Sequence, residues 1–304
     1  MIVYVLLCLL QIVIPLWLVR SMARRGPRHP RDLSLQVLSG GAYLLFTYLV
    51  LPWGFVPYLF RYLWPLLYAA AAVAAGSKVL HHAKVGAEPA KPRTSALVTL
   101  ALLLCFGNPV MMALRGHRYL GQALNLEFPL REGISLVGHG GSDPSINYHN
   151  VHPQQRYALD ISGLNWLGLR SWSLDSSRLN QYAVYGRTLY SPCDATVRSV
   201  VSDLPDQIPP ASDPEHPAGN HVELEVEGVR IFLAHMQPGS ILVKPGEQVK
   251  RGVPLGKVGN SGNTTEPHLH LHAVRGGTGL YDGEGIPLTF RGRFLVRNDV
   301  VLPH

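Results

Sequence analysis

Cysteine is scarce in this chain, with three residues among 304. Cys8 and Cys105 lie within apolar runs, and Cys193 stands alone in the second half of the chain. No two cysteines have the CxxC spacing of a metal-binding or redox motif, and the spacing does not suggest a disulfide framework. We therefore expect Cys193 to be a small, partly buried residue rather than a nucleophile.

Charged residues are also few, at 15% of the chain, yet the formal net charge is +7. Much of the positive excess lies in two short segments between apolar runs, residues 20–33 and 77–94. The second half of the chain has no basic stripe with interleaved aromatic residues, the pattern typical of nucleic-acid binding. We therefore expect no nucleic-acid partner, and we interpret the basic segments as loops that set membrane topology.

Long apolar runs dominate residues 1–115. Four of them have lengths near that needed to cross a bilayer: 2–19, 35–52, 62–76 and 96–114. No basic segment precedes the first run, whereas a cleaved signal peptide begins with one, so we expect a retained helix. Six aromatic residues around the second and third runs suit the membrane–water interface: Trp53, Phe55, Tyr58, Phe60, Tyr62 and Trp64. Residues 1–115 are thus predicted to form a membrane region of about four transmembrane helices.

The basic loops predict the orientation of this region. With four spans both loops lie on one side, which the positive-inside rule assigns to the cytoplasm. Residues 116–304 then form a periplasmic or extracellular domain of a multi-pass protein in the cytoplasmic (inner) membrane. With three spans the loops would face opposite sides, and this conflict favours four. Four spans exceed the needs of anchoring in the lipid bilayer, which suggests a membrane-protein partner as well.

Residues 116–304 are rich in Gly, Pro, Asp, Ser and His and show no long amphipathic helix. Short runs with alternating or β-branched residues, bounded by Gly, Pro and Asp, predict strands at 195–201, 221–226, 229–234 and 268–274. Segment 243–258 has the pattern of paired hairpins with glycine turns. The expected fold class is an N-terminal α-helical membrane region followed by a C-terminal all-β domain.

Histidine is concentrated in the segment Glu-Pro-His-Leu-His-Leu-His at residues 266–272. Alternation along a strand places His268, His270 and His272 on one face and the two leucines on the other. Imidazoles on one rigid face can hold a metal ion and leave one histidine for proton transfer. A polar strand face that is merely rich in histidine would have the same pattern.

A candidate metal constellation extends upstream of this segment. Its members, in chain order, are His149, His152, Asp160, His235, His268 and His270. A carboxylate and two imidazoles suit zinc, and three protein ligands leave a fourth position for water. Bound zinc lowers the pKa of that water to about 7 and polarises a carbonyl group. The remaining histidines would move protons or stabilise an oxyanion, so Zn2+ is the expected cofactor.

Five ordered segments resemble the motifs of lysostaphin-like (LytM-type) zinc endopeptidases, which cut the cross-link peptides of peptidoglycan. The segments are 157–161, 186–197, 219–236, 243–256 and 259–270. The last, Gly-Asn-Ser-Gly-Asn-Thr-Thr-Glu-Pro-His-Leu-His, is the most specific, because it resembles Gly-x-Ser-Gly-x-Ser-Thr-Gly-Pro-His-Leu-His. The resemblance covers about residues 130–275 and implies an antiparallel sheet with a groove.

The resemblance also implies roles for individual residues. By position, Asp160 and His270 would ligate zinc. His235 and His268 would be the catalytic histidines, which assist the attacking water or stabilise the tetrahedral intermediate.

The third ligand departs from the family pattern. The family has a histidine four residues before the aspartate, where this chain has Arg156, which stays protonated and cannot ligate. Relatives with a Gln-Arg-Tyr-Ala-x-Asp block take this histidine from an upstream Asn-x-His segment. His149, in Asn-Tyr-His, is therefore the expected third ligand, with His152 as the alternative.

Two further positions depart from the pattern without removing a ligand. Glu266 stands where the family has glycine, and His272 stands where it usually has glutamate. His272 shares the ligand face, so it would either support a ligand from behind or be a solvated strand residue.

The expected function is that of a membrane-anchored zinc metalloendopeptidase that hydrolyses peptide bonds in peptidoglycan cross-links by zinc-activated water. The alternative is a catalytically weak or inactive LytM-like module that binds the cell wall or activates other wall hydrolases. Arg156 favours the alternative, whereas retention of the aspartate and the three catalytic-region histidines opposes it. A third interpretation keeps the chemistry but takes a peptide substrate in a protein rather than in the wall.

Overall fold

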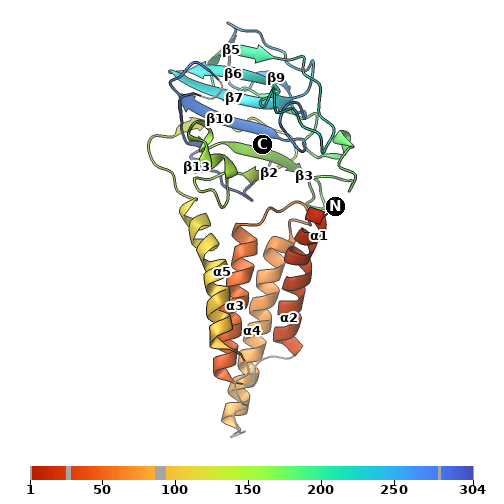
Figure 1. Cartoon of the computed structure of the whole chain (residues 1–304), viewed down its shortest axis with the longest axis vertical. Helices are drawn as coiled ribbons and strands as arrows, with labels where there is room; N and C mark the ends of the chain where they lie inside the picture. The colour runs from red at the N-terminus through yellow and green to blue at the C-terminus, as the bar shows by residue number, and fades with distance from the viewer. Residues whose placement is uncertain (1, 25–28, 86–93, 280–281, 304) are drawn as a thin grey trace. The chain divides into compact units, whose positions relative to one another are not determined.

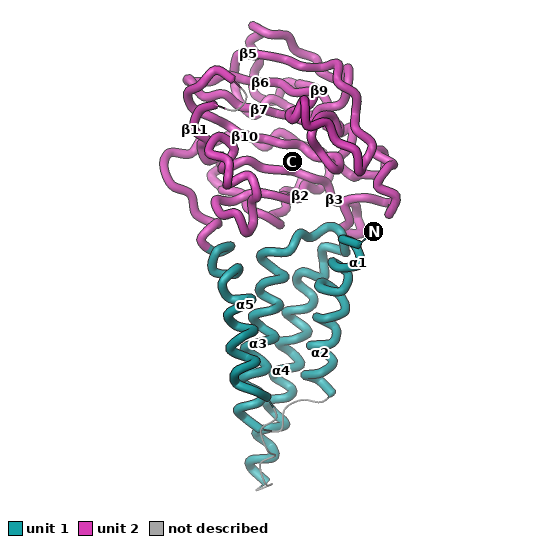
Figure 2. The backbone as a smooth tube through the Cα atoms, viewed as in Figure 1, with its two compact units in different colours: residues 1–114 teal, residues 115–304 magenta. Residues whose placement is uncertain are grey.

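The computed structural model describes residues 2–24, 29–85, 94–279 and 282–303. The chain divides into two compact units, residues 1–114 and 115–304, which Figure 2 colours separately. The first unit is helical and the second is built mainly from β-strands (Figure 1). The predicted fold class, apolar helices followed by an antiparallel β domain, is confirmed.

The helical unit consists of long helical segments joined by short connections. Its elements are α1 (Ile2–Cys8), a π-helical stretch (Leu9–Val13), α2 (Ile14–Arg24), α3 (Pro30–Leu49), α4 (Phe60–Lys84) and α5 (Ala96–Arg115). The predicted run 62–76 lies inside α4, which extends to Lys84 because polar residues at the end of a helix can continue it beyond its apolar part. Of the predicted basic loops, residues 25–28 and 86–93 lie outside the described residues.

Three helical segments of the described chain are long and apolar enough to cross a membrane: Ile2–Arg24, Phe60–Lys84 and Ala96–Arg115. The predicted second span is helical, as α3, but is not among the three. This helix ends at Leu49 and carries Arg31 and Asp32 in its first turn, which lowers its mean hydropathy. Of the four apolar spans expected from the sequence, three are thus candidate membrane spans and the fourth is a less apolar helix.

Two aromatic residues predicted at the membrane interface lie inside the helical unit instead. Trp53 is 2% exposed and its Nε1 donates to the carbonyl oxygen of Thr47 at 3.0 Å. Trp64 is 7% exposed and its Nε1 donates to the carbonyl oxygen of Gln11 at 2.8 Å. The packing of α4 against α2 and α3 covers these rings, which hydropathy along the chain does not predict.

A nine-stranded antiparallel sheet forms the centre of the second unit. Its order is β14-β2-β3-β10-β7-β6-β5-β8, with β11 paired to β10. The strands are β2 (Ile134–His139), β3 (Leu159–Leu164), β5 (Ala195–Val201), β6 (Asn220–Val226), β7 (Val229–Met236), β8 (Gln248–Val249), β10 (Leu269–Arg275), β11 (Glu284–Gly285) and β14 (Val300–Val301).

Smaller elements surround this sheet. One small sheet has β1 (Leu124–Leu126), β12 (Leu288–Phe290) and β13 (Arg293–Phe294), and the other has β4 (Thr188–Tyr190) and β9 (Pro254–Lys257). Short 3-10 helices lie in the connections: η2 (Tyr148–Val151), η3 (Pro153–Gln155) and η4 (Leu179–Gln181).

The four predicted strands correspond to β5, β6, β7 and β10, with ends that differ by at most two residues. The predicted pairing within 243–258 is wrong. β8 pairs with β5 and β9 pairs with β4, so the two short strands of this segment join different sheets. Glycine turns indicate where the chain reverses, but they do not specify which neighbour each strand meets.

Alternation along β10 separates the core from the site, as the sequence predicts. Leu269, Leu271 and Ala273 are at most 2% exposed and belong to the hydrophobic core cluster. His270 and His272 therefore extend from the opposite face of the sheet. The core thus fixes the strand on which the candidate site is built.

Candidate metal centre and catalytic groove

β3 and β10 are neighbours in the sheet, and their register places Asp160 opposite His270. All six residues of β3 are buried, and Leu159 and Ile161 belong to the core. Alternation therefore directs Asp160 to the face that carries His270. The Nδ1 atom of His270 lies 2.9 Å from Oδ1 of Asp160.

His149 reaches the same carboxylate from the short helix η2. Asn147, which is fully buried, precedes this helix, and its Oδ1 accepts from the backbone N–H of His149 at 3.2 Å. Its Nδ2 donates to the carbonyl oxygens of Gly141 and Ala158 at 2.9 and 3.0 Å. This support holds Nε2 of His149 at 3.0 Å from both carboxylate oxygens of Asp160.

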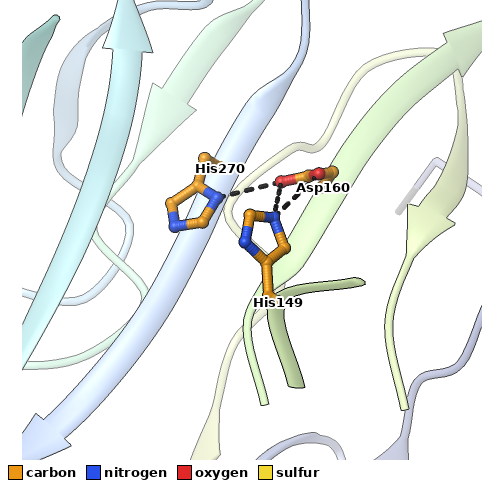
Figure 3. Close-up of side chains that lie close together, drawn as sticks. All are labelled: His149, Asp160 and His270. Atoms are coloured by element: carbon orange, nitrogen blue, oxygen red, sulfur yellow. Dashed lines mark hydrogen bonds and ion pairs between the residues drawn. The ribbon is translucent and has the colours of Figure 1, made fainter. Parts of the chain in front are cut away.

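His149, Asp160 and His270 thus form one buried cluster (Figure 3). One possible ligand atom from each lies within 4.8 Å of the others. One carboxylate and two imidazoles are the donor set of a three-ligand zinc site, so the residues present fit that metal. The sequence left His149 and His152 as alternatives, and the structure brings His149 into the cluster.

His152 and Arg156 lie outside this cluster. Both side chains are exposed, and the guanidinium carbon of Arg156 lies 5.3 Å from the centre of the Tyr157 ring. Arg156 therefore takes the sequence position of the expected histidine without entering the set of donors.

Each histidine of the cluster has a second polar neighbour behind it. The Nδ1 atom of His149 lies 3.1 Å from Oε1 of Gln155. The Nε2 atom of His270 lies 2.9 Å from Nδ1 of His272. His272 is 2% exposed and its ring stacks on Phe232 with the ring centres 4.7 Å apart, so it is not a solvated strand residue.

His235 is held in an unusual backbone conformation on β7. Its φ is 61°, a left-handed value that costs about 1–3 kcal/mol for a residue other than glycine. Its Nδ1 lies 2.8 Å from the carbonyl oxygen of Ser261, so Nδ1 carries the proton and donates. The Ser261 loop packs closely on Gly219, where a Cβ would lie 2.2 Å from the same carbonyl oxygen. Glycine at 219 is therefore required for the contact that orients His235.

His268 precedes β10 and lies beside His235, with the ring centres 4.7 Å apart. Its Nδ1 donates to the carbonyl oxygen of Glu266 at 2.8 Å, and its Nε2 lies 3.5 Å from Oδ1 of Asp160. The side chain of Glu266 forms an ion pair with Arg170, which is 8% exposed. The residue that replaces the family glycine thus ties the His268 segment to the loop after β3.

The environment shifts the acid–base behaviour of these groups. Burial raises the pKa of Asp160, but the charges of His149 and His268 and their hydrogen bonds outweigh it and hold the pKa well below its usual range. Burial lowers the pKa of His270 to about 4. Burial, followed by the charges of His268 and His270, holds the pKa of His235 well below its usual value. The ionised Asp160 carboxylate therefore faces His270 in the neutral form, in which a ring nitrogen can bind a metal.

A cavity of about 180 Å3 opens on this face of the sheet. Side chains of the cluster, of β7 and of the 217–218 and 263 segments line it. The lining residues are Tyr148, His149, His152, Gln155, Pro217, Ala218, Phe232, Ala234, His235, Asn263, His270 and His272. The cluster and His235 therefore share a common groove.

A second group of residues, which the sequence does not predict, lies beside the cluster. His139, at the end of β2, is in register with Asp160, and its Nδ1 accepts from Nη2 of Arg297 at 2.7 Å. Its ring lies 4.4 Å from that of Tyr148. Burial, followed by the charge of Arg297, lowers the pKa of His139 to about 3. These residues come from a strand, a short helix and a loop, and the loop with Arg297 is far from the other two in the chain, so no local sequence signal could have found them.

Cys193 is half-buried, which confirms its predicted environment. Burial, with a smaller effect of Asp194, raises the pKa of its thiol to about 11. A thiol with so little thiolate at neutral pH is a poor nucleophile.

Part of the chain is similar to known peptidases. Over 60 residues the chain is 40% identical to Peptidoglycan DD-endopeptidase ShyA of Vibrio cholerae, a match that covers 19% of this chain and 14% of the relative. A zinc-containing peptidase from Vibrio cholerae aligns at 21% identity with a TM-score of 0.32, covering 60% of this chain and 41% of that one. Lysostaphin from Staphylococcus simulans aligns at 23% identity with a TM-score of 0.21, covering 34% and 42%.

The model of one protein family matches part of the chain. The match begins at residue 181, whereas the resemblance predicted from the sequence begins at about residue 130. It therefore includes His235, His268 and His270 but neither His149 nor Asp160. Residues 181–281 of the chain match the model of Peptidase family M23.

Proposed function

We propose that this protein is a membrane-anchored zinc metalloendopeptidase that hydrolyses peptide bonds in peptidoglycan cross-links. The observation that carries this proposal is the convergence of His149, Asp160 and His270, from three separate segments, on one buried point beside His235 and His268. Polar groups are rarely buried in such a cluster unless they hold a ligand or take part in chemistry.

Asp160, His149 and His270 would hold the metal. Bound zinc would polarise the scissile carbonyl and make its water nucleophilic near neutral pH. The open groove beside the cluster would admit an extended peptide.

His235 and His268 would supply proton transfer. In both, Nδ1–H donates to a backbone carbonyl, of Ser261 and Glu266 respectively, so that Nε2 keeps its lone pair. A histidine fixed in this tautomer can accept a proton from the attacking water and, once protonated, stabilise the oxyanion or deliver the proton to the leaving amine.

Peptidoglycan is proposed as the substrate on two grounds. The relative that matches over 60 residues is a peptidoglycan DD-endopeptidase. In addition, with α3 counted as a fourth membrane crossing, the basic segments 20–33 and 77–94 lie on one side of the membrane, which favours a location of residues 115–304 outside the cytoplasm, where peptidoglycan lies.

The full-length protein in detergent tests this function. We expect about one zinc per chain by elemental analysis and release of soluble peptides from purified peptidoglycan. In His270→Ala both zinc and hydrolysis should be lost, whereas His152→Ala, which changes an exposed histidine in the same groove, should keep both. Full hydrolysis by His270→Ala would reject the assignment. A wild-type zinc content near zero in zinc-replete medium would favour a binding module, and cleavage of proteins but not of peptidoglycan would reject the substrate.

A further inference from the structure

His270 has a polar neighbour at each of its two ring nitrogens. Nδ1 lies 2.9 Å from Oδ1 of Asp160, and Nε2 lies 2.9 Å from Nδ1 of His272. A neutral imidazole has one N–H donor and one lone pair, so the proton on one nitrogen decides what the other can do. The tautomer of His270 therefore determines whether His272 must donate or accept a hydrogen bond.

Without a metal, the Asp160 carboxylate can only accept, so His270 donates through Nδ1. Its Nε2 is then an acceptor, and His272 must donate through Nδ1. A metal ligand nitrogen must be unprotonated. Since Nδ1 is the nitrogen on the side of Asp160, it would be the one that faces the metal. The proton then lies on Nε2, and His272 must accept where it previously donated.

His272 has the properties that this change requires. Its ring is held against Phe232, with an angle of 9° between the planes, so it need not move. Its Nε2 is buried without a hydrogen-bond partner among the described residues, so no contact fixes either tautomer. An ionised glutamate, the residue usual at this position in the resembling family, could only accept.

The other histidine of the cluster has a comparable neighbour. Nδ1 of His149 contacts the side-chain amide of Gln155, which carries both a donor and an acceptor and can present either after rotation. The neighbours of both histidines, His272 and Gln155, can therefore act as either donor or acceptor.

We propose that His272 is a positioning residue for zinc, which orients His270 and changes from donor to acceptor as the metal enters. This inference rests on the proposed function, because it requires that the cluster bind zinc. Because its buried Nε2 has no hydrogen-bond partner among the described residues, His272 should lower the free energy of unfolding of the metal-free protein.

His272→Phe tests the proposal, because phenylalanine can keep the stacking on Phe232 but offers no acceptor. In the full-length protein we expect zinc affinity, measured by competition with a chromophoric chelator, to fall about 10–100-fold. The melting temperature of the chelator-treated protein should stay unchanged or rise by about 2–4 °C. A purely structural histidine would instead lower the melting temperature.

His272→Glu provides a second, independent variant. Its carboxylate can accept from Nε2 of His270, so zinc affinity should remain within about 10-fold of the wild type. The metal-free protein should melt at a lower temperature, because a buried carboxylate then faces the lone pair of His270. Zinc should therefore raise its melting temperature more than it does for the wild type.

His221→Phe is the matched control. Its ring lies 6.5 Å from that of Phe232, and its Nδ1 donates to the carbonyl oxygen of Gly219, away from the cluster. Zinc affinity should be unchanged in this variant. Wild-type affinity in His272→Phe would overturn the inference and leave the proposed function intact, whereas absence of zinc binding by the wild type would overturn both.

Discussion

The two units of the chain bury polar side chains in opposite ways. In the helical unit, buried polar side chains such as Gln11 and Arg61 bind separate parts of the backbone. Gln11 donates to the carbonyl oxygen of Pro52 at 2.9 Å, and Arg61 donates to that of Tyr48 at 3.0 Å. In the strand unit, by contrast, the Asp160 carboxylate is contacted by His149, His268 and His270, so several titratable side chains meet at one point.

This difference distinguishes polar groups that are buried to stabilise the fold from polar groups that are buried to bind a ligand or take part in a reaction. A side chain that binds a carbonyl group satisfies a backbone atom that would otherwise be unpaired, and so it stabilises a connection between helices. Several titratable groups that converge on one point form few hydrogen bonds with the backbone. Their burial is costly in free energy unless they bind a cation or take part in a reaction. The comparison predicts that changes in the strand unit alter chemistry and that changes in the helical unit alter stability.

Asp160→Asn should have the largest effect, because it removes the carboxylate that all three neighbouring histidines face. The amide keeps the size of the side chain but cannot supply an anionic ligand. We expect zinc content near zero by elemental analysis and a fall in peptidoglycan hydrolysis of about 10³-fold or more. Asp203→Asn, at an exposed position after β5, should behave as the wild type. Near-normal zinc content and rate in Asp160→Asn would contradict the chemical role of the cluster.

His235→Gln should have the next largest effect, and it separates proton transfer from metal binding. Glutamine can still donate to a nearby carbonyl group but cannot take up a proton at neutral pH. We expect hydrolysis to fall about 10²–10⁴-fold while zinc content stays near one per chain. His216→Gln is the control, since that histidine is exposed and pairs with Asp213. If zinc were lost from His235→Gln, the residue would belong with the ligands or with the fold instead.

The parts of this site that the sequence predicted are those encoded locally. Alternation on one strand places His270 and His272 on the same face, and the Asn-Tyr-His segment leads to His149, which a buried asparagine then supports. The contact between His139 and Arg297 joins a strand to a loop that is far away in the chain, so no local pattern reveals it. The same holds for the burial of Trp53 in the helical unit, where packing rather than hydropathy decides the outcome.

The metal-free protein should lose stability below about pH 6.5. Burial lowers the pKa of four histidines in the folded protein, to about 3 for His139, to about 4 for His270 and well below the usual value for His235 and His272, whereas histidines of the unfolded chain titrate near 6.5. Below pH 6.5 the unfolded state therefore binds more protons, and the free energy of unfolding decreases as the pH falls. The expected loss is about 1.4 kcal/mol per histidine for each pH unit, until the folded pKa is reached.

Melting temperatures of chelator-treated protein between about pH 7.5 and 5 measure this slope. His272→Phe removes one of the four histidines and should reduce the slope by about one quarter. A melting temperature that does not change over this interval would mean that the histidines of the cluster take up protons without unfolding.

The smallest effect is expected from Gln11→Leu in the helical unit. Leucine removes the hydrogen bond to the Pro52 carbonyl, but it also removes Oε1, a buried oxygen without a partner among the described residues. These two changes oppose each other, so the free energy of unfolding should change by no more than about 1 kcal/mol. Zinc content and the rate of hydrolysis per folded molecule should equal those of the wild type, because no group of the cluster depends on Gln11. A lower rate from a fully folded, zinc-loaded variant would show that the helical unit acts on the chemistry of the strand unit and not only on membrane attachment.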